Sequence, residues 1–362
     1  MRFNTERVKL KSVCEIKYGK DHKKLGDGNI PTYGSGGLMR YVDKSIHNKK
    51  SVLIPRKGSL SNLFLVEPPF WTVDTLFWTD IDTQKIHPDF LYYQLCTMDL
   101  ASRNVGTAVP SLTTTLLNEL EIMLPSMEIQ EQIVSTLAVL DAKIKQNAKI
   151  NDNLQQQASA LYGKYFPYAV TDDLPAGWRI GTVGEIVEIH DSKRIPLSGA
   201  QRAKMEKRIY PYYGAASLMD YVDEYIFDGI YLLLGEDGTV VDDAGYPILQ
   251  YVWGQFWVNN HAHILTGKLG FNVESLLLLF KRTPVKSIVT GAVQPKISQA
   301  NLRSVQVVIP PQTELDAFNE LIRPMFDQIR QNQNQNKVLA TMRDSLLPKL
   351  MSGEIDVSNI EI

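Results

Sequence analysis

One stretch of this chain occurs twice, and the repeat constrains the fold more than any other feature. Residues 31–43 read PTYGSGGLMRYVD and residues 211–223 read PYYGAASLMDYVD, with eight of the thirteen positions identical. Further along, Gly58 falls opposite Gly238, and GTAVPSL at 106–112 faces GAVQPKI at 291–297. The offset drifts only from about 180 to about 185 residues, so one half of the chain copies the other. A duplicated binding module indicates a ligand with two sites.

Each half predicts the same mixture of strands and helices. VLIP, TLFWTDI, YLLLG and HAHILTG are strand-like segments between Gly, Pro, Asn and Asp breaks, whereas 89–102 and 272–280 have the pattern of helices. We therefore expect an α+β fold with two repeated globular domains and two long helices. The predicted segments are domain 1 at 1–125, helix 1 at 126–166, a linker at 167–177, domain 2 at 178–310, helix 2 at 311–351 and a tail at 352–362.

Both long helices carry apolar residues at alternating steps of four and three, the seam of a coiled coil. In each seam two asparagines replace apolar residues at matching points, and a buried seam asparagine fixes register at a cost in stability. If the helices pack antiparallel, Asn147 can meet Asn336 and Asn151 can meet Asn332. The alternative is a frayed or solvated seam at these positions. The predicted seam residues are Ile129, Ile133, Leu137, Leu140, Ile144, Leu154, Ala158, Leu161 and Tyr165, with Phe318, Ile322, Met325, Ile329, Leu339, Leu346 and Leu350.

Charge is nearly balanced over the 362 residues, with a net value of −2. That balance argues against strong non-specific nucleic-acid binding, which rests on cations facing phosphates. The first 50 residues differ, because they hold twelve Lys and Arg against five Asp and Glu. No apolar run reaches the roughly 18 residues of a membrane helix, and the N-terminus lacks an apolar signal segment. With only two cysteines, a cytoplasmic protein is expected.

Catalytic motifs are weak in this sequence. EPPF at 67–70 resembles the loop with which amino-methyltransferases hold a flipped base, but Glu67 replaces the short side chain expected there and the second half reads VWGQF. TGKL at 266–269 lacks the upstream glycine of a phosphate loop. His261 and His263 would share one face of a strand without further ligands nearby, so no metal site is expected. Three functions remain open: a DNA-specificity subunit, a self-contained methyltransferase or nuclease, and a protein-only coiled-coil adaptor.

Binding residues gather in three motifs of each half. We call them the YG loop (33–40 and 213–220), the glycine turn (55–62 and 235–242) and the GxxxP segment (106–112 and 291–297). The first glycine turn offers Arg56, Lys57 and Asn62, and arginine and asparagine make bidentate contacts to bases. The second has Glu236 and Asp237 instead; carboxylates accept from cytosine amines but repel phosphates. A shared frame with exchanged side chains is expected of two modules that read different sequences. The alternative is that both segments are ordinary hairpin turns.

With the motifs in this doubled order, the whole chain resembles the specificity subunit of type I restriction–modification systems (HsdS-like). The resemblance implies two target recognition domains, each binding one half of a split site in double-stranded DNA. It implies helices that pack antiparallel as a spacer and dock two modification subunits, which carry S-adenosylmethionine and adenine-N6 methylation. A restriction subunit using ATP and Mg can join. The chain itself would be non-catalytic and would bind no cofactor or metal directly.

DNA contacts are expected in the loops of each module. In the first half the candidates are Lys20, Lys23, Lys24, Tyr33, Ser35, Gly36, Arg40, Arg56, Lys57, Ser59, Asn62, Thr107 and Ser111. In the second half they are Lys193, Arg194, Tyr213, Ser217, Asn259, Asn260, His261 and Lys296. Asn147, Asn151, Asn332 and Asn336 are the candidate register residues of the coiled coil.

Overall fold

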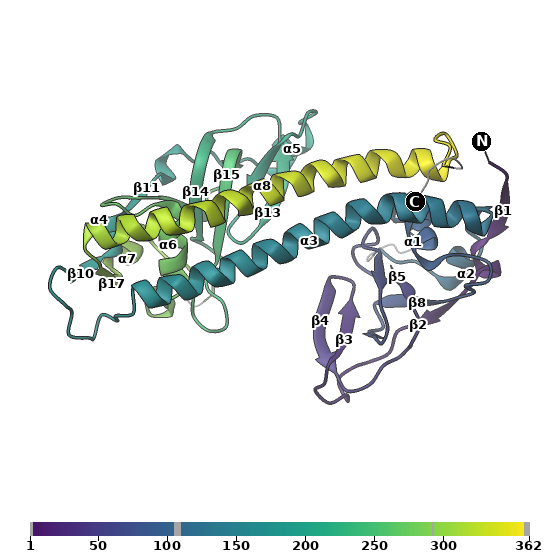
Figure 1. The fold of residues 1–362 in the computed structure, drawn as a ribbon, viewed down its shortest axis with the longest axis horizontal. Coiled ribbons are helices and arrows are strands. Elements are labelled where there is room, and N and C mark those ends of the chain that lie inside the picture. Colours follow the sequence, from purple (N-terminus) through teal and green to yellow (C-terminus); the bar gives the residue numbers. More distant parts are fainter. Residues whose placement is uncertain (1–2, 105–109, 292, 358–362) are drawn as a thin grey trace. The chain divides into compact units, whose positions relative to one another are not determined.

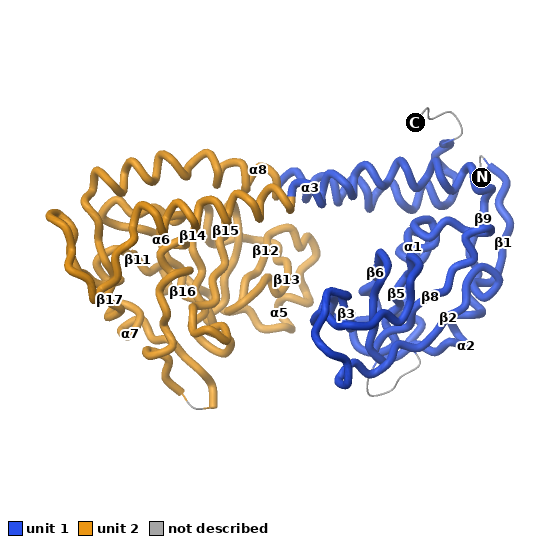
Figure 2. The backbone as a smooth tube through the Cα atoms, turned by 60° about the horizontal axis from the view of Figure 1, so that its bottom comes forward, with its two compact units in different colours: residues 1–147, 334–362 blue, residues 148–333 orange. Residues whose placement is uncertain are grey.

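The structure, a computed structural model, describes residues 3–104, 110–291 and 293–357. The chain forms two compact units, coloured separately in Figure 2. Unit 1 comprises Met1–Asn147 and Asn334–Ile362, and unit 2 comprises Ala148–Gln333. Among the described residues, none of the helices has the length and apolar character needed to cross a bilayer.

Unit 1 contains strands in three sheets and short helices around them (Figure 1). The strand orders are β1-β9, β2-β8-β5-β6 and β4-β3-β7. The strands are β1 (Thr5–Lys9), β2 (Cys14–Tyr18), β3 (Ile30–Gly34), β4 (Gly37–Val42), β5 (Ser51–Pro55), β6 (Phe64–Val66), β7 (Trp71–Thr72), β8 (Leu76–Ile81) and β9 (Glu121–Pro125). The short helices are α1 (Pro88–Cys96) and α2 (Thr114–Asn118), with 3-10 turns at Leu10–Ser12 and Ala101–Arg103.

Unit 2 has the strand orders β10-β17 and β11-β16-β14-β15-β12-β13. Its strands are β10 (Arg179–Thr182), β11 (Val187–Ile189), β12 (Tyr210–Tyr213), β13 (Leu218–Val222), β14 (Phe227–Gly235), β15 (Leu249–Val258), β16 (Ala262–Gly267) and β17 (Gln306–Ile309). Its short helices are α4 (Val183–Ile186), α5 (Gly199–Ala203), α6 (Val273–Phe280) and α7 (Gln299–Ser304), with 3-10 turns at Asp191–Lys193 and Lys286–Ile288. Both units mix helices and strands, as the α+β prediction states.

The register of the strands repeats from one unit to the other. In the β3–β4 hairpin, Tyr33 pairs with Leu38 after a bulge, and in the β12–β13 hairpin Tyr213 pairs with Leu218 after a bulge at the same place. The first strand of each hairpin also pairs in parallel with a strand from further along the chain, β7 in unit 1 and β15 in unit 2. The sequence repeat is therefore a repeat of backbone structure.

One departure from the copied frame lies at the EPPF motif. In unit 1, β6 ends at Val66 and β7 begins at Trp71, whereas in unit 2 the corresponding β15 continues from Leu249 to Val258. Proline has no N–H to donate to a strand ladder, so Pro68 and Pro69 interrupt the pairing. Glu67 forms an ion pair with Lys50, 2.8 Å between Oε1 and Nζ. The motif therefore ends a strand in unit 1.

Two long helices, α3 (Met127–Tyr165) and α8 (Gln312–Met351), contribute residues to both units. In unit 1, the Asn147 side-chain amide donates to Asn336 Oδ1 at 2.8 Å, and in unit 2 the Asn332 amide donates to Asn151 Oδ1 at 2.8 Å. These are the two pairs that an antiparallel arrangement predicts, and Asn147, Asn151 and Asn332 are buried. A second contact in each unit, Asp141 with Arg343 in unit 1 and Tyr162 with Phe318 in unit 2, shows that the two helices run in opposite directions there.

The apolar faces of these helices close the core of each unit. In unit 1, Ile133 and Leu137 of α3 join a cluster with Leu347 and Leu350 of α8. In unit 2, Phe318 and Ile322 of α8 pack with Ala158 and Tyr162 of α3.

At the end of the predicted seam, Tyr165 is 37 % exposed but still contacts Phe318 of α8, with 5.5 Å between the ring centres. Phe166 and Tyr162, which are buried, pack edge-on against Phe318 as well, so the aromatic contact with α8 is broader than the predicted seam.

Candidate nucleic-acid interface

In unit 1 the three predicted motifs lie next to one another. The Gly58 N–H of the glycine turn donates to Pro110 O of the GxxxP segment at 3.2 Å, and Leu112 N–H donates to Arg56 O at 3.0 Å. The Asn62 side-chain amide reaches the YG loop, donating to Ser35 O at 3.2 Å. Residues separated by more than 70 positions in the chain therefore form one continuous loop surface.

Unit 2 repeats this arrangement with different side chains. Gly238 N–H donates to Pro295 O at 3.0 Å, and Ile297 N–H donates to Glu236 O at 2.9 Å. Gly58 and Gly238 both have φ of +88°, a left-handed conformation that favours glycine. The backbone that presents the two glycine turns is therefore the same.

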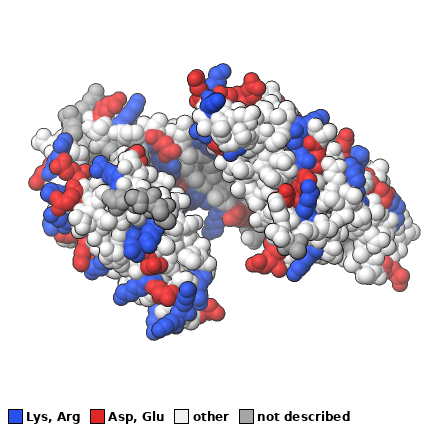
Figure 3. Space-filling view, turned by 180° about the vertical axis from the view of Figure 1, so that it is seen from behind, with Lys and Arg blue, Asp and Glu red and all other residues white. Residues whose placement is uncertain are grey.

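The surface of unit 1 carries basic side chains near these loops. Lys23 lines an open groove of about 600 Å³ together with Ser35, Gly36 and Met39. Figure 3 shows Lys and Arg side chains gathered on the lower part of unit 1, at lower left in that view. The exposed predicted residues of this half are Lys20, Lys23, Lys24, Gly36, Lys57, Ser59 and Asn62, while Tyr33, Ser35 and Ser111 are half-buried. Thr107 lies outside the described residues.

Two predicted arginines of unit 1 are held by the protein itself. Arg40 donates to Asp27 Oδ1 at 2.8 Å and to Leu25 O at 3.3 Å. Arg56 donates to Asp74 O at 3.0 Å, and its guanidinium lies 5.4 Å from the centre of the Tyr18 ring. Sequence alone could not show these partners. Lys57, which is exposed at the tip of the turn, is the freer cation for a ligand.

In unit 2 the predicted residues divide into surface and interior groups. Lys193, Ser217, Asn260 and Lys296 are exposed, and Tyr213 and His261 are half-buried. Asn259 is not on the surface: it is 4 % exposed and accepts from His261 N–H at 2.8 Å. Arg194 also points inward, donating to Glu236 at 2.5 Å and to Ala262 O at 2.8 Å. Both residues hold the loop through contacts within the protein.

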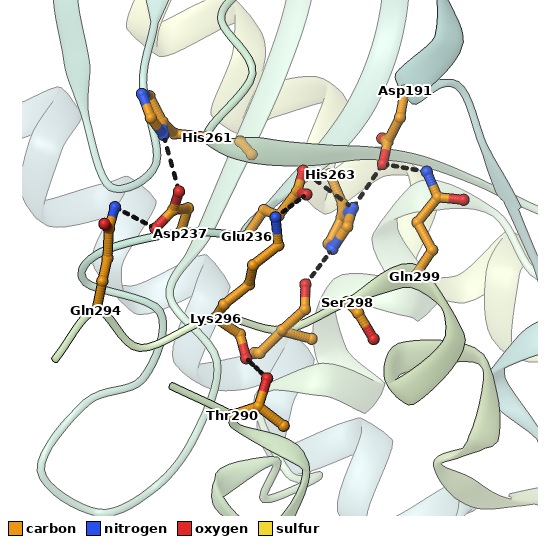
Figure 4. A network of polar contacts seen from close by, with 12 residues as sticks. Asp191, Glu236, Asp237, His261, His263, Thr290, Gln294, Lys296, Ser298 and Gln299 are labelled. Carbon is orange, nitrogen blue, oxygen red and sulfur yellow. Dashed lines mark hydrogen bonds and ion pairs between the residues drawn. The ribbon is translucent and has the colours of Figure 1, made fainter. Parts of the chain in front are cut away.

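Beneath the second glycine turn lies a network of polar side chains (Figure 4). His263 is fully buried, with Nδ1 2.6 Å from Asp191 Oδ2 and Nε2 2.8 Å from Ile297 O. Asp191 also accepts from the Gln299 amide at 2.6 Å and from Ile264 N–H at 3.0 Å. The network connects β16, the 3-10 turn at 191–193 and the GxxxP segment.

The hydrogen bonds assign charges within this network. Both ring nitrogens of His263 face oxygen atoms, the Asp191 carboxylate on one side and Ile297 O on the other. Burial raises the pKa of Asp191, but the hydrogen bond and charge of His263, the Ile264 N–H and Arg194 outweigh it and hold that pKa below its usual value. The deepest part of the site is therefore ionic.

The same cluster has the composition of a cation site, since Asp191, Glu236 and His263 place potential ligand atoms within 4.8 Å of one another. Arg194 contacts both carboxylates, at 3.4 Å from Asp191 and 2.5 Å from Glu236, and Lys296 lies 3.3 Å from Glu236. Protein cations thus already balance the two negative charges. The arrangement is that of an ion-pair network that supports the turn.

Strand registers identify the counterparts of this network in unit 1. Gly235 pairs with Ala262 next to His263, and Pro55 pairs with Leu76 next to Phe77, so Phe77 occupies the position of His263. Tyr18 pairs with Phe77, and continuing the β11–β16 register two residues past its last pair, Ile189 with Leu265, brings Asp191 opposite His263, so Tyr18 corresponds to Asp191. Arg56 and Glu236 correspond because they follow the paired residues Pro55 and Gly235. Tyr18 packs edge-on against Phe77, 5.0 Å between ring centres. Unit 1 thus has a cation over an aromatic pair where unit 2 has buried ions.

The sequence patterns did not place Tyr18, Asp191 or Gln299 among the functional positions. The sequence does contain a signal for the correspondence of Phe77 and His263. Aligning TLFWTDI with HAHILTG places these two residues opposite each other. The equivalence of Tyr18 and Asp191 has a shorter offset than the glycine turns, since loop lengths differ between the halves. Only the strand register makes it visible.

The chain matches the model of a protein family described as "Type I restriction modification DNA specificity domain" over residues 4–156 and 175–340. The two matched segments contain the two copies of the YG loop. They cover most of the chain.

Individual relatives agree with that match. The chain is 23 % identical to the type I restriction enzyme MjaIX specificity subunit of Methanocaldococcus jannaschii, over 97 % of this chain and 94 % of that protein. It is 33 % identical over 38 % of its length to a putative type I restriction enzyme specificity subunit of Haemophilus influenzae, covering 36 % of that protein. The crystal structure of a type I restriction–modification S subunit from M. genitalium has the same fold, with a TM-score of 0.56, 19 % identity and 96 % coverage of both chains.

Proposed function

Because this chain belongs to the family of type I restriction–modification DNA specificity proteins, we propose that each unit reads one half of a bipartite site in double-stranded DNA. The observation that carries this proposal is the copied loop frame with exchanged side chains. Both glycine turns have the same backbone contacts, yet Arg56 and Lys57 of one correspond to Glu236 and Asp237 of the other. Such a frame can hold two similar ligands that differ in their hydrogen-bonding groups.

The exposed residues of the loops, together with the half-buried His261, are the proposed readers. Lys57, Ser59 and Asn62 extend from the first turn, and Asn260, His261 and Lys296 surround the second. In unit 2 the Asp237 carboxylate lies 3.5 Å from His261 and accepts from Gln294 at 2.5 Å. Basic residues at 20–24 would contact phosphates, which positions the protein on DNA without reading sequence.

The long helices are proposed to set the distance between the two half-sites and to bind the modification subunits. Each spans about 40 residues, or about 60 Å at 1.5 Å per residue. Two modification subunits would bind this framework and supply S-adenosylmethionine and methylation, and a restriction subunit with ATP and Mg could join them. Exposed apolar residues on both helices, Val139 and Val338 among them, offer contact surface. The chain would then act without catalysis of its own.

Methylation mapping tests the assignment of half-sites. We expect Lys57→Ala, in a chain assembled with its modification subunits, to relax or weaken one half-site only, because a lost base contact costs about 1–3 kcal/mol. Lys296→Ala in unit 2 is the matched variant and should affect the other half-site. If both variants weakened both half-sites equally, these lysines would contact phosphates only. Methylation by the chain alone would instead favour a self-contained enzyme, and an assembled complex without DNA affinity would favour a protein-only adaptor.

A heptad deletion tests the spacer. Removing seven residues from each helix shortens it by about 10 Å, close to three base pairs at 3.4 Å each. A heptad keeps the seam facing inward, so we expect unchanged half-sites separated by a shorter gap. Removing two residues from each helix turns the seam by about 200° and should abolish assembly. An unaltered gap with full activity after the heptad deletion would show that the helices do not set the spacing.

A further inference from the structure

The hairpins of the YG loops expose residues that are identical in the two units. Leu38, Met39 and Tyr41 on β4 are 50–55 % exposed. Their counterparts on β13 are Leu218, Met219 and Tyr221, at 41–54 % exposed. We call each set the hairpin ribbon of its unit. Core packing explains copied buried residues, but it gives no reason to keep large apolar side chains in contact with water.

We propose that each hairpin ribbon docks the same protein partner, a chain that the assembly contains in two copies. This proposal rests on the proposed function, in which the modification subunits are such a pair. If the units read different half-sites, residues that contact bases should differ between them. Residues identical at the surface of both units should instead contact something identical at both places.

Charge around the ribbons favours a protein over the DNA backbone, the other ligand common to both half-sites. A phosphate-binding surface would keep a cation in both units. Arg40, which lies between Met39 and Tyr41 in the sequence, corresponds to Asp220 in unit 2. Both are neutralised locally, Arg40 by Asp27 at 2.8 Å and Asp220 by Arg202 at 3.1 Å. The one charge that both copies of the repeated stretch share is an aspartate, Asp43 and Asp223, which repels phosphate.

The chemistry of the ribbons also suits a protein interface. The centres of such interfaces are enriched in tyrosine and methionine and depleted in charged residues. The methionine lies close to a copied glycine in both units, because a Cβ added to Gly34 would lie 2.6 Å from Met39 Sδ, and one added to Gly214 would lie 2.4 Å from Met219 Sδ. A larger residue at this glycine would displace the methionine, so the copied glycine keeps room for it in both units.

Paired substitutions can test each ribbon separately. In the co-expressed complex, Leu38→Ser with Tyr41→Ser should remove one of two modification subunits, and Leu218→Ser with Tyr221→Ser should remove the other, as counted by native mass spectrometry. We expect affinity at the altered site to fall at least about tenfold, as for truncated anchor residues. Tyr41→Lys alone serves as a second variant and should weaken the same site.

Ile180→Ser is the matched control. Ile180 is 46 % exposed, but its register counterpart in unit 1 is Arg7, so it is exposed without being copied. This control should bind both subunits, and circular dichroism should show folded chains throughout. Full retention of both subunits by the ribbon variants would overturn the proposal; weakened DNA binding alongside would assign the ribbons to DNA. If the unaltered chain bound no modification subunit, the proposed function itself would fail.

Discussion

The two glycine turns share one backbone conformation, but the side chains beneath them differ in chemistry. In unit 1, Arg56 lies over Tyr18, which packs against Phe77. In unit 2 the same three positions hold Glu236, Asp191 and His263, linked by ion pairs. When the side chains of a binding turn change, the side chains packed beneath the turn change with them. A carboxylate at position 236 requires cations around it, whereas an arginine at position 56 can rest on aromatic rings.

This comparison explains why the turns should not be interchangeable residue by residue. Glu236 is contacted by Arg194 at 2.5 Å and by Lys296 at 3.3 Å, and His263 lies 3.7 Å away. An arginine placed there alone would face the positive charges of Arg194 and Lys296 at short range. Exchange of specificity between the units therefore requires the turn together with its supporting side chains.

The largest difference between the two turns should follow removal of Asp191. Asp191→Ala removes the carboxylate nearest to the buried His263 ring and leaves Glu236, 3.7 Å away, as its remaining acidic neighbour. Breaking such a buried pair costs about 3–5 kcal/mol of unfolding free energy. The counterpart Tyr18→Ala removes a ring that is 52 % exposed and should cost only about 1 kcal/mol. Urea unfolding of the two variants measures both values. Equal losses would mean that the network contributes no more than the aromatic pair.

Pair couplings sharpen the same comparison. A double-mutant cycle on Arg194 and Glu236, both largely buried, should give a coupling of about 1–3 kcal/mol. The cycle on Arg56 and Tyr18 should give about 0.5–1 kcal/mol, the range of an exposed cation–ring contact. Each cycle uses alanine at both positions and denaturant unfolding as readout. A larger coupling in unit 1 would reverse the proposed order.

The smallest expected effect is a dependence on pH in unit 2. The folded-state pKa of Asp191 lies below its ordinary value of 3.8, mainly because His263 and Ile264 N–H stabilise the carboxylate against the cost of burial. A depressed pKa contributes stability above the ordinary value and loses it as the pH falls through the folded-state value. The difference in unfolding free energy between the unaltered chain and the Asp191→Asn variant should therefore become smaller below about pH 4. A gap that widened on acidification would contradict the assignment of charge.

Sequence alone predicted the features that depend on spacing. The repeat led to the shared loop frame, and the heptad period led to the asparagine pairs, because a fixed period determines which face of a helix a residue occupies. It did not predict that Arg194 and Asn259 point inward, since their partners are brought near by strand pairing. The domain boundaries and the individual DNA contacts stay predictions.

Unit 1 draws its core from both ends of the chain, and this affects how the protein is made on the ribosome. Ile133 and Leu137 are synthesised early, yet the Leu347 and Leu350 side chains that cover them come from the last helix. Synthesis of residues 148–333 must come between, which takes about 10–40 s at 5–20 residues per second. The module translated second can thus close first, while the module translated first waits with an open apolar face. A chaperone that shields nascent chains would have its longest task at the beginning of this protein.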